Sequence, residues 1–115
     1  MNLGDPLDRS FLPDVGDLYW VKSIIFWSGD RKPTRPVVVL ESPPDRFGRI
    51  LMVTRTSDTS RKGVFHDAMP EIGLTKPGVF RNLVSAAASV WTPRNVQHLG
   101  SLPAATFDKI MDRLG

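Results

Sequence analysis

Cysteine is absent from this chain of 115 residues, which excludes disulfides, thiolate zinc sites and cysteine nucleophiles. Long apolar runs are absent too. The longest uninterrupted apolar stretches are four residues, whereas a membrane-spanning helix needs roughly 20. The first residues contain no basic segment followed by an apolar core, so we expect no secretory signal. Together these absences favour a cytoplasmic protein that does not enter a membrane.

Histidine is scarce, and the acidic residues show no paired arrangement. His66 and His98 are far apart in the sequence, with no carboxylate at ligand spacing, so we expect no metal site and no cofactor. We interpret His66 as a loop histidine rather than as half of an acid–base pair with Asp67. Nothing in the pattern is typical of glycoside hydrolysis or of metal-dependent phosphate chemistry.

Positive charge is concentrated in the middle of the chain. The net charge is +3, but residues 31–62 hold eight Lys and Arg against three acids, which gives +5 there and −2 elsewhere. Such a concentration favours a polyanionic partner, because each phosphate contact releases counterions. The alternative is that these cations only keep loops and an edge strand solvated.

Two apolar runs, residues 37–40 and 50–53, flank a dense turn signal at residues 43–48. This pattern predicts an antiparallel hairpin. Arg35 begins the first strand and Thr56 ends the second, so both should reach the same edge of one sheet. A guanidinium beside a hydroxyl suits the binding and polarisation of a phosphodiester.

The rest of the chain predicts further short strands at residues 18–26, 64–66, 78–85 and 96–99. In residues 78–85 strict alternation predicts Arg81 on one face and Asn82 on the other. Trp20 and Trp91 are predicted to lie in the core. A C-terminal helix carries one apolar stripe at the spacing i, i+3, i+4, i+7: Phe107, Ile110, Met111 and Leu114.

These elements predict a small barrel of the α+β class, mainly β, with a C-terminal α-helix. Residues 1–12 are predicted to be a loosely ordered leader, and residues 13–115 a single domain.

Several segments, in order, resemble the MazF/PemK toxins of toxin–antitoxin systems. Residues 13–21 (PDVGDLYWV) resemble the family's opening strand, and the Arg-Pro pair before residues 37–40 resembles its second strand. Residues 53–57 (VTRTS) match its Thr/Ser-rich strand end, and residues 100–103 lead into a helix as in that family. The resemblance implies an SH3-like β-barrel of the MazF/CcdB type, usually a homodimer.

The resemblance also implies an activity: metal-independent endoribonuclease cleavage of single-stranded RNA, with a cognate antitoxin protein as partner. The RNA's own 2′-hydroxyl attacks the adjacent phosphorus, leaving 2′,3′-cyclic phosphate and 5′-hydroxyl ends. The family's catalytic arginine falls on Arg35 and its catalytic threonine on Thr56. Its RNA-contacting loop falls on residues 28–34.

The residue chemistry agrees with these roles. Arg35 can offer two parallel N–H groups to phosphoryl oxygens, and Thr56 can donate one hydrogen bond from a restrained side chain. The alternatives are that Arg35 only caps an edge strand and that Thr56 is an ordinary strand residue. Candidate RNA-binding residues, from aromatic stacking or proximity of cations and hydroxyls, are Trp27, Arg31, Lys32, Arg55, Ser57, Arg61 and Lys62.

Two other functions stay open. A CcdB-like toxin would inhibit DNA gyrase by protein–protein contact through its C-terminal helix and would not need Arg35 or Thr56. A non-catalytic barrel would only bind nucleic acid or protein. The strand at residues 78–85 departs from the resemblance. Many members have an acidic or amide residue and a further arginine after the apolar start, and here that start is followed only by Arg81 and Asn82.

Overall fold

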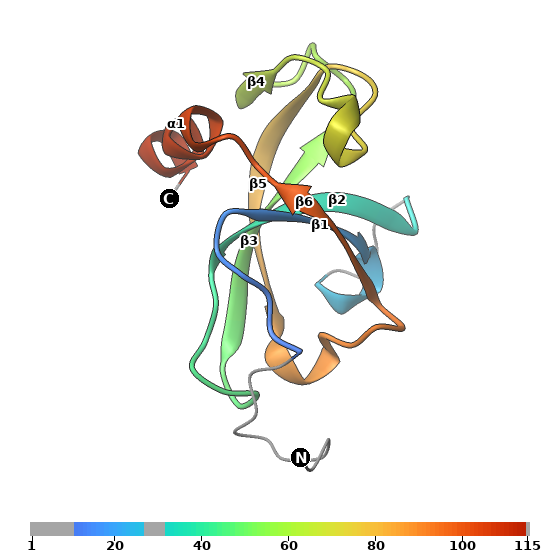
Figure 1. Cartoon of the computed structure of the whole chain (residues 1–115), viewed down its shortest axis with the longest axis vertical. Helices are drawn as coiled ribbons and strands as arrows, with labels where there is room; N and C mark the ends of the chain where they lie inside the picture. Colours follow the sequence, from blue (N-terminus) through green and yellow to red (C-terminus); the bar gives the residue numbers. More distant parts are fainter. Residues whose placement is uncertain (1–10, 27–31, 115) are drawn as a thin grey trace.

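The computed structural model describes residues 11–26 and 32–114, which form a strongly curled antiparallel sheet with a helix at one end (Figure 1). The six strands lie in the order β4-β5-β3-β2-β1-β6. The elements are β1 (Asp17–Lys22), η1 (Ser23–Ile25), β2 (Thr34–Glu41), β3 (Arg49–Thr56), β4 (Val64–His66), η2 (Pro70–Ile72), β5 (Gly78–Ala87), η3 (Ala88–Val90), β6 (Val96–Ser101) and α1 (Ala104–Leu114), where η marks a 3₁₀ turn. The mainly β class with a C-terminal helix is confirmed.

The predicted hairpin is confirmed as β2 and β3, which pair antiparallel with Val38 opposite Val53. In the turn between them, the carboxylate of Asp45 accepts a hydrogen bond from the N–H of Phe47 at 2.9 Å. A Cβ on Gly48 would lie 2.5 Å from Cβ of Pro43, so this close approach needs a glycine.

The curled sheet is packed on both faces at β2. Because strand side chains alternate, Val37 and Val39 enter one apolar cluster while Val38 and Leu40 enter the other. The cluster that holds Trp91 and Met52 lies on one face of the sheet. Helix α1 packs on the other cluster and contacts β4 and β5 (Figure 1).

The prediction that the first strand runs to residue 26 was wrong, because β1 ends at Lys22. The hydroxyl of Ser23 donates to the carbonyl of Lys32 at 2.6 Å, and its N–H donates to the carbonyl of Pro33 at 2.9 Å. These bonds turn the chain into η1 and tie it to the start of β2. Ile24, expected inside a strand, is 70% exposed.

The strict alternation predicted for residues 78–85 was also wrong. Phe80 lies opposite Arg55 and Asn82 lies opposite Thr54, so Arg81 is an extra residue in a β-bulge. Residues after the bulge therefore point to the opposite face from the one that strict alternation predicts. Phe80 and Asn82, two positions apart, point to opposite sides of the sheet.

The two tryptophans predicted for the core differ. Trp91 is buried, with its ring 5.0 Å from that of Tyr19 in an edge-on arrangement, as predicted. Trp20 is 41% exposed, because the face of β1 that carries it is covered only in part at that end.

The ends of the chain are described only in part. Residues 1–10 of the predicted leader lie outside the described residues, but Leu12 is half-buried and packs against the cluster around Trp91. In residues 11–26 and 32–114, no helix has the length and apolar character needed to cross a bilayer.

Two neighbouring helix residues test how α1 docks. Ile110 is fully buried, whereas Met111, on the same predicted stripe, is 40% exposed. Ile110→Ala should lower the free energy of unfolding by about 2–5 kcal/mol, because it leaves a cavity. Met111→Ala should lower it by less than about 1 kcal/mol. Urea denaturation measures both, and equal losses would contradict this docking.

Candidate functional site

The strands β2 and β3 separate at one end of the sheet. Their last pair at this end is Val37 with Thr54; beyond it Arg35 pairs with Val21 of β1, and Thr56 pairs with Val79 of β5. Arg35 is two residues from Val37, and Thr56 is two residues from Thr54, so the strand period directs both side chains to the same face. The shared edge expected from the sequence is therefore consistent with the backbone register.

A cavity of about 450 Å³ opens beside Arg35 at this end. Its polar lining comes from β2, β3 and β5: Arg35, Thr54, Arg81 and Asn82. Its apolar lining is Phe26, Leu83, Val84 and Leu114. In the described part of the chain, this lining carries two guanidinium groups and no carboxylate, so the cavity favours an anion.

Arg81 belongs to this site, although the sequence did not mark it as a site residue. The bulge turns this residue out of the regular ladder of β5, toward the cavity beside Arg35. Its Nε is buried and makes no hydrogen bond within the described residues. A buried donor without an acceptor is costly unless a bound group supplies one. The only sequence signal was the position of Arg81 in a strand with few other polar groups.

Thr56, the predicted catalytic threonine, is half-buried at the end of β3 and does not line the cavity; Thr54 does. The Oγ1 of Thr56 accepts a hydrogen bond from the N–H of Asp58 at 3.1 Å. This bond leaves the hydroxyl hydrogen available for a second partner.

Arg55 lies on the other face of β3, away from the cavity. Its Nε donates to Nε2 of His66 at 3.1 Å, and its Nη2 donates to the carbonyl oxygens of Lys76 at 2.6 Å and Pro77 at 3.3 Å. These bonds use Nε and Nη2 of the guanidinium that the sequence suggested for RNA binding.

The interpretation of His66 as a loop histidine was wrong. The residue ends β4, is 4% exposed, and packs against the ring of Phe80 at 5.0 Å. Burial lowers the pKa of His66 from its ordinary value, and the charge of Arg55 acts in the same direction.

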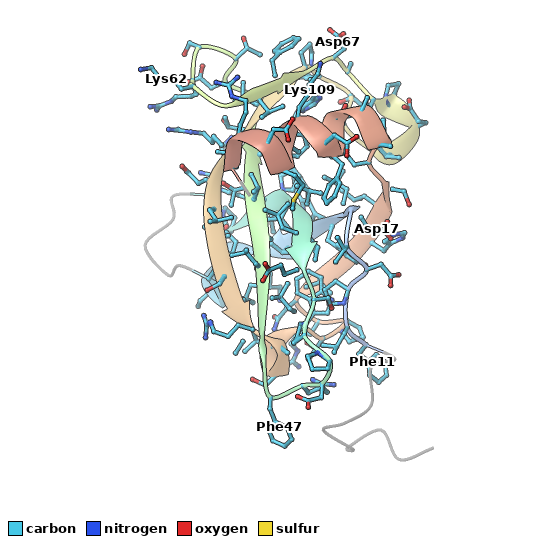
Figure 2. All side chains as sticks on the ribbon, turned by 90° about the vertical axis from the view of Figure 1, so that its left-hand side faces the viewer. Phe11, Asp17, Phe47, Lys62, Asp67 and Lys109 are labelled. Carbon is cyan, nitrogen blue, oxygen red and sulfur yellow. The ribbon has the colours of Figure 1, made fainter. Side chains whose placement is uncertain are left out.

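The other predicted RNA-binding residues are scattered or not described. Trp27 and Arg31 lie outside the described residues. Lys32, Ser57, Arg61 and Lys62 are exposed, and Nε of Arg61 pairs with the carboxylate of Asp58 at 3.3 Å. Figure 2 shows Lys62 at the end of the molecule where α1 lies, far from the hairpin tip at Phe47.

A second cavity, of about 400 Å³, lies between β1 and β6 beside Tyr19 and Trp91. The carboxylate of Asp17 lines it and accepts hydrogen bonds from Nε2 of His98 and from Oγ of Ser101, each at 2.8 Å. Asp14 adds a second carboxylate. Two acids disfavour a phosphate, so the cavity beside Arg35 is the better candidate for a polyanion.

Among the described residues, no group of three or more His, Asp or Glu side chains could hold a metal ion.

The geometry defines a small, curled antiparallel β-barrel of the α+β class with a cationic cavity beside Arg35. No protein-family model matches the sequence, and no curated protein matches it. Among solved structures, the chain is similar to one in a crystal structure of MazE–MazF, form II, from Deinococcus radiodurans. The TM-score is 0.63 with 20% sequence identity, over 90% of this chain and 92% of that chain. The fold is therefore that of a MazF-like small β-barrel.

Acidification should destabilise the protein through His66. The unfolded chain binds a proton at this residue near the ordinary pKa of about 6.5, whereas the folded protein binds it only at lower pH. The contribution of neutral His66 is thus complete above that pKa and is lost as the pH falls below it, by at most about 1.4 kcal/mol per pH unit. Urea denaturation between pH 7.5 and 5 should show a smaller loss for His66→Gln.

Met111→Ala is the control, since it changes no titratable group and lies on the exposed side of α1, with Met111 40% exposed. It should keep the pH dependence of the unmodified protein. An unchanged pH dependence in His66→Gln would contradict the assignment.

Proposed function

We propose that this protein is the toxin of a type II toxin–antitoxin system, a metal-independent endoribonuclease that cleaves single-stranded RNA. The observation that carries the proposal is the convergence of Arg35 and Arg81 on one cavity without a carboxylate, in a MazF-like barrel. The concentration of positive charge in residues 31–62 supports the same class of substrate. A cytoplasmic location goes with this function.

In the proposed reaction, the 2′-oxygen of one nucleotide forms a bond to the adjacent phosphorus. The bond between that phosphorus and the 5′-oxygen of the next nucleotide breaks. The 2′-hydroxyl loses its proton and the 5′-oxygen gains one, so the ends are a 2′,3′-cyclic phosphate and a 5′-hydroxyl. Negative charge grows on the non-bridging oxygens, and catalysis is mainly electrostatic stabilisation and positioning.

Each residue has a role in this proposal. Arg35 binds the scissile phosphate through its forked N–H groups, which lysine cannot reproduce. Thr56 donates its hydroxyl hydrogen to a phosphoryl oxygen. Arg81 binds the same or a neighbouring phosphate, which gives its buried Nε an acceptor. Asn82 has an amide that can contact a base edge or the 2′-hydroxyl.

The proposal includes two protein partners, an antitoxin and a second copy of this chain. A protein antitoxin that covers the cationic cavity would compete with RNA for it. A protein partner agrees with the similar structure, which is of a complex, MazE–MazF. A homodimer would cover apolar side chains that the protomer exposes: Phe65 on the edge strand β4 is 53% exposed, and Leu83 on β5 is 50% exposed.

Replacing Arg35 should abolish most of the activity. With single-stranded RNA in EDTA, the unmodified protein should produce fragments with 5′-hydroxyl ends. Arg35→Ala should lower the cleavage rate on the order of 10²–10³-fold, and Arg35→Lys should restore little of it. End mapping by labelling with a polynucleotide kinase, without prior phosphatase treatment, identifies the 5′-hydroxyl.

Arg46 gives the matched control, because it lies in the hairpin at the other end of β2, where its Nη2 donates to the carbonyl of Ser89 at 3.3 Å. Arg46→Ala should leave the cleavage rate within about twofold. Intact RNA together with inhibited DNA supercoiling by gyrase would favour the CcdB-like function instead. RNA that is bound but never cut would favour a non-catalytic barrel.

For the cleavage rate, the hydroxyl of Thr56 should matter more than the branched shape of its side chain. Thr56→Val keeps the branched side chain but removes the donor, and should lower the rate on the order of 10²-fold, whereas Thr56→Ser should retain most of it. Thr59→Val, in the exposed loop that follows, is the matched control and should have little effect. Equal rates for Thr56→Val and the unmodified protein would remove Thr56 from the mechanism.

A further inference from the structure

The strongest unexplained feature outside the cavity is the buried contact between Arg55 and His66. Arg55 Nε donates its hydrogen to His66 Nε2, so this ring nitrogen is the acceptor. The hydrogen of the neutral ring is then on Nδ1, which donates to the carbonyl oxygen of Asp67 at 2.7 Å. The contact therefore requires a neutral imidazole with one defined tautomer.

The backbone of β5 is shaped to admit this contact. His66 pairs with Gly78 across β4 and β5. A Cβ on Gly78 would lie 2.4 Å from Nε of Arg55 and 2.6 Å from the carbonyl oxygen of Thr56. Only glycine leaves room for the guanidinium here. A side chain at position 78 would thus collide with both Arg55 and the backbone of Thr56.

This arrangement also secures the loop after β4. Two hydrogen bonds join Nη2 of Arg55 to the carbonyls of Lys76 and Pro77, immediately before β5. Thr56 pairs with Val79 in that strand. The direction in which β3 ends is thus held from one face by Arg55, while the side chain of Thr56 points to the opposite face.

We propose that Arg55 and His66 are positioning residues for Thr56, and that protonation of His66 releases the end of β3. The proposal rests on the proposed function, since it explains how the catalytic threonine is aimed. A protonated imidazole has no acceptor nitrogen, so it cannot receive the hydrogen of Arg55 and repels the guanidinium. Thr56 then loses its fixed direction, and cleavage slows at acidic pH.

The charges around His66 act in known directions. Burial opposes protonation most, and the charge of Arg55 on β3 acts in the same direction. The hydrogen bond to the carbonyl of Asp67 and, more weakly, the carboxylate of Asp67 favour protonation. From β5 the groups against the ring are Gly78 and Phe80. Helix α1 brings Lys109, Asp112 and Arg113 to the neighbouring residues of β4, so its charges offset one another in part.

Cleavage kinetics between pH 5 and 8 test the proposal. The unmodified protein should lose kcat toward pH 5 with little change in KM. His66→Gln keeps an acceptor for Arg55 but does not titrate, so it should retain activity at pH 7.5 and lose much less at pH 5. Arg55→Lys should lower kcat about tenfold or more at every pH, with KM within about twofold. A melting curve establishes that each variant is folded.

A spectroscopic measurement separates this proposal from the proposed function. In ¹⁵N NMR, Nδ1 of His66 should carry the hydrogen at neutral pH. The amide signal of Thr56 should shift with the titration of His66, and this shift should vanish in His66→Gln. The amide of Val38, buried in the middle of β2, is the control and should not follow.

The outcomes are distinct. If Thr56 follows His66 but no RNA is cut at any pH, the proposed function fails and the positioning contact stands. If RNA is cut but Thr56 does not follow His66, or if His66→Gln keeps the full acid loss of kcat, the positioning proposal is overturned.

Discussion

The burial of β2 on both faces is the constraint on which the rest of the structure depends. Its four consecutive apolar residues supply both clusters alternately, so β2 cannot slip in register without moving apolar side chains from one cluster into the other. The strand pairs with β1 over residues 34–38 and with β3 over residues 37–41. At its first residues, β2 pairs with β1 and no longer with β3, while the end of β3 pairs with β5. The cationic cavity opens at this parting, and Arg35 stands beside it.

The cations of residues 31–62 have different roles in the structure. Arg35 faces the cavity with Arg81, which comes from outside the charged segment. Arg55 is turned to the opposite face and holds a loop and a strand together through three hydrogen bonds. Arg61 is exposed and pairs with Asp58. A concentration of charge in sequence therefore favours a polyanionic partner but does not locate the site, because neighbouring cations on a strand point to opposite faces.

Local patterns predicted the fold well, and of the residues that line the candidate cavity they named Arg35 as a candidate. The hairpin, the short strand β4, the final strand and the C-terminal helix follow from apolar runs, turn residues and a helical stripe, all of which act over a few residues. Arg35 and Thr56 follow from that hairpin. Three predictions from the sequence were wrong: where β1 ends, that Trp20 is in the core, and that His66 is a loop histidine. Each of these features depends on which distant segment packs against the residue. Ser23 leaves the strand to bond residues 32 and 33, and His66 is buried by Arg55 and Phe80.

The alternation along β2 and β3, the tight turn between them and the apolar stripe of α1 can be read from the sequence. They arise from backbone geometry and side-chain type over short distances. The entry of Arg81 into the cavity of Arg35 depends on the folded chain, because the bulge that turns it there arises from the pairing of β5 with β3, nearly thirty positions earlier in the chain. The contact of Arg55 with a buried histidine likewise depends on the folded chain. Both arrangements depend on packing between segments that are distant in the chain.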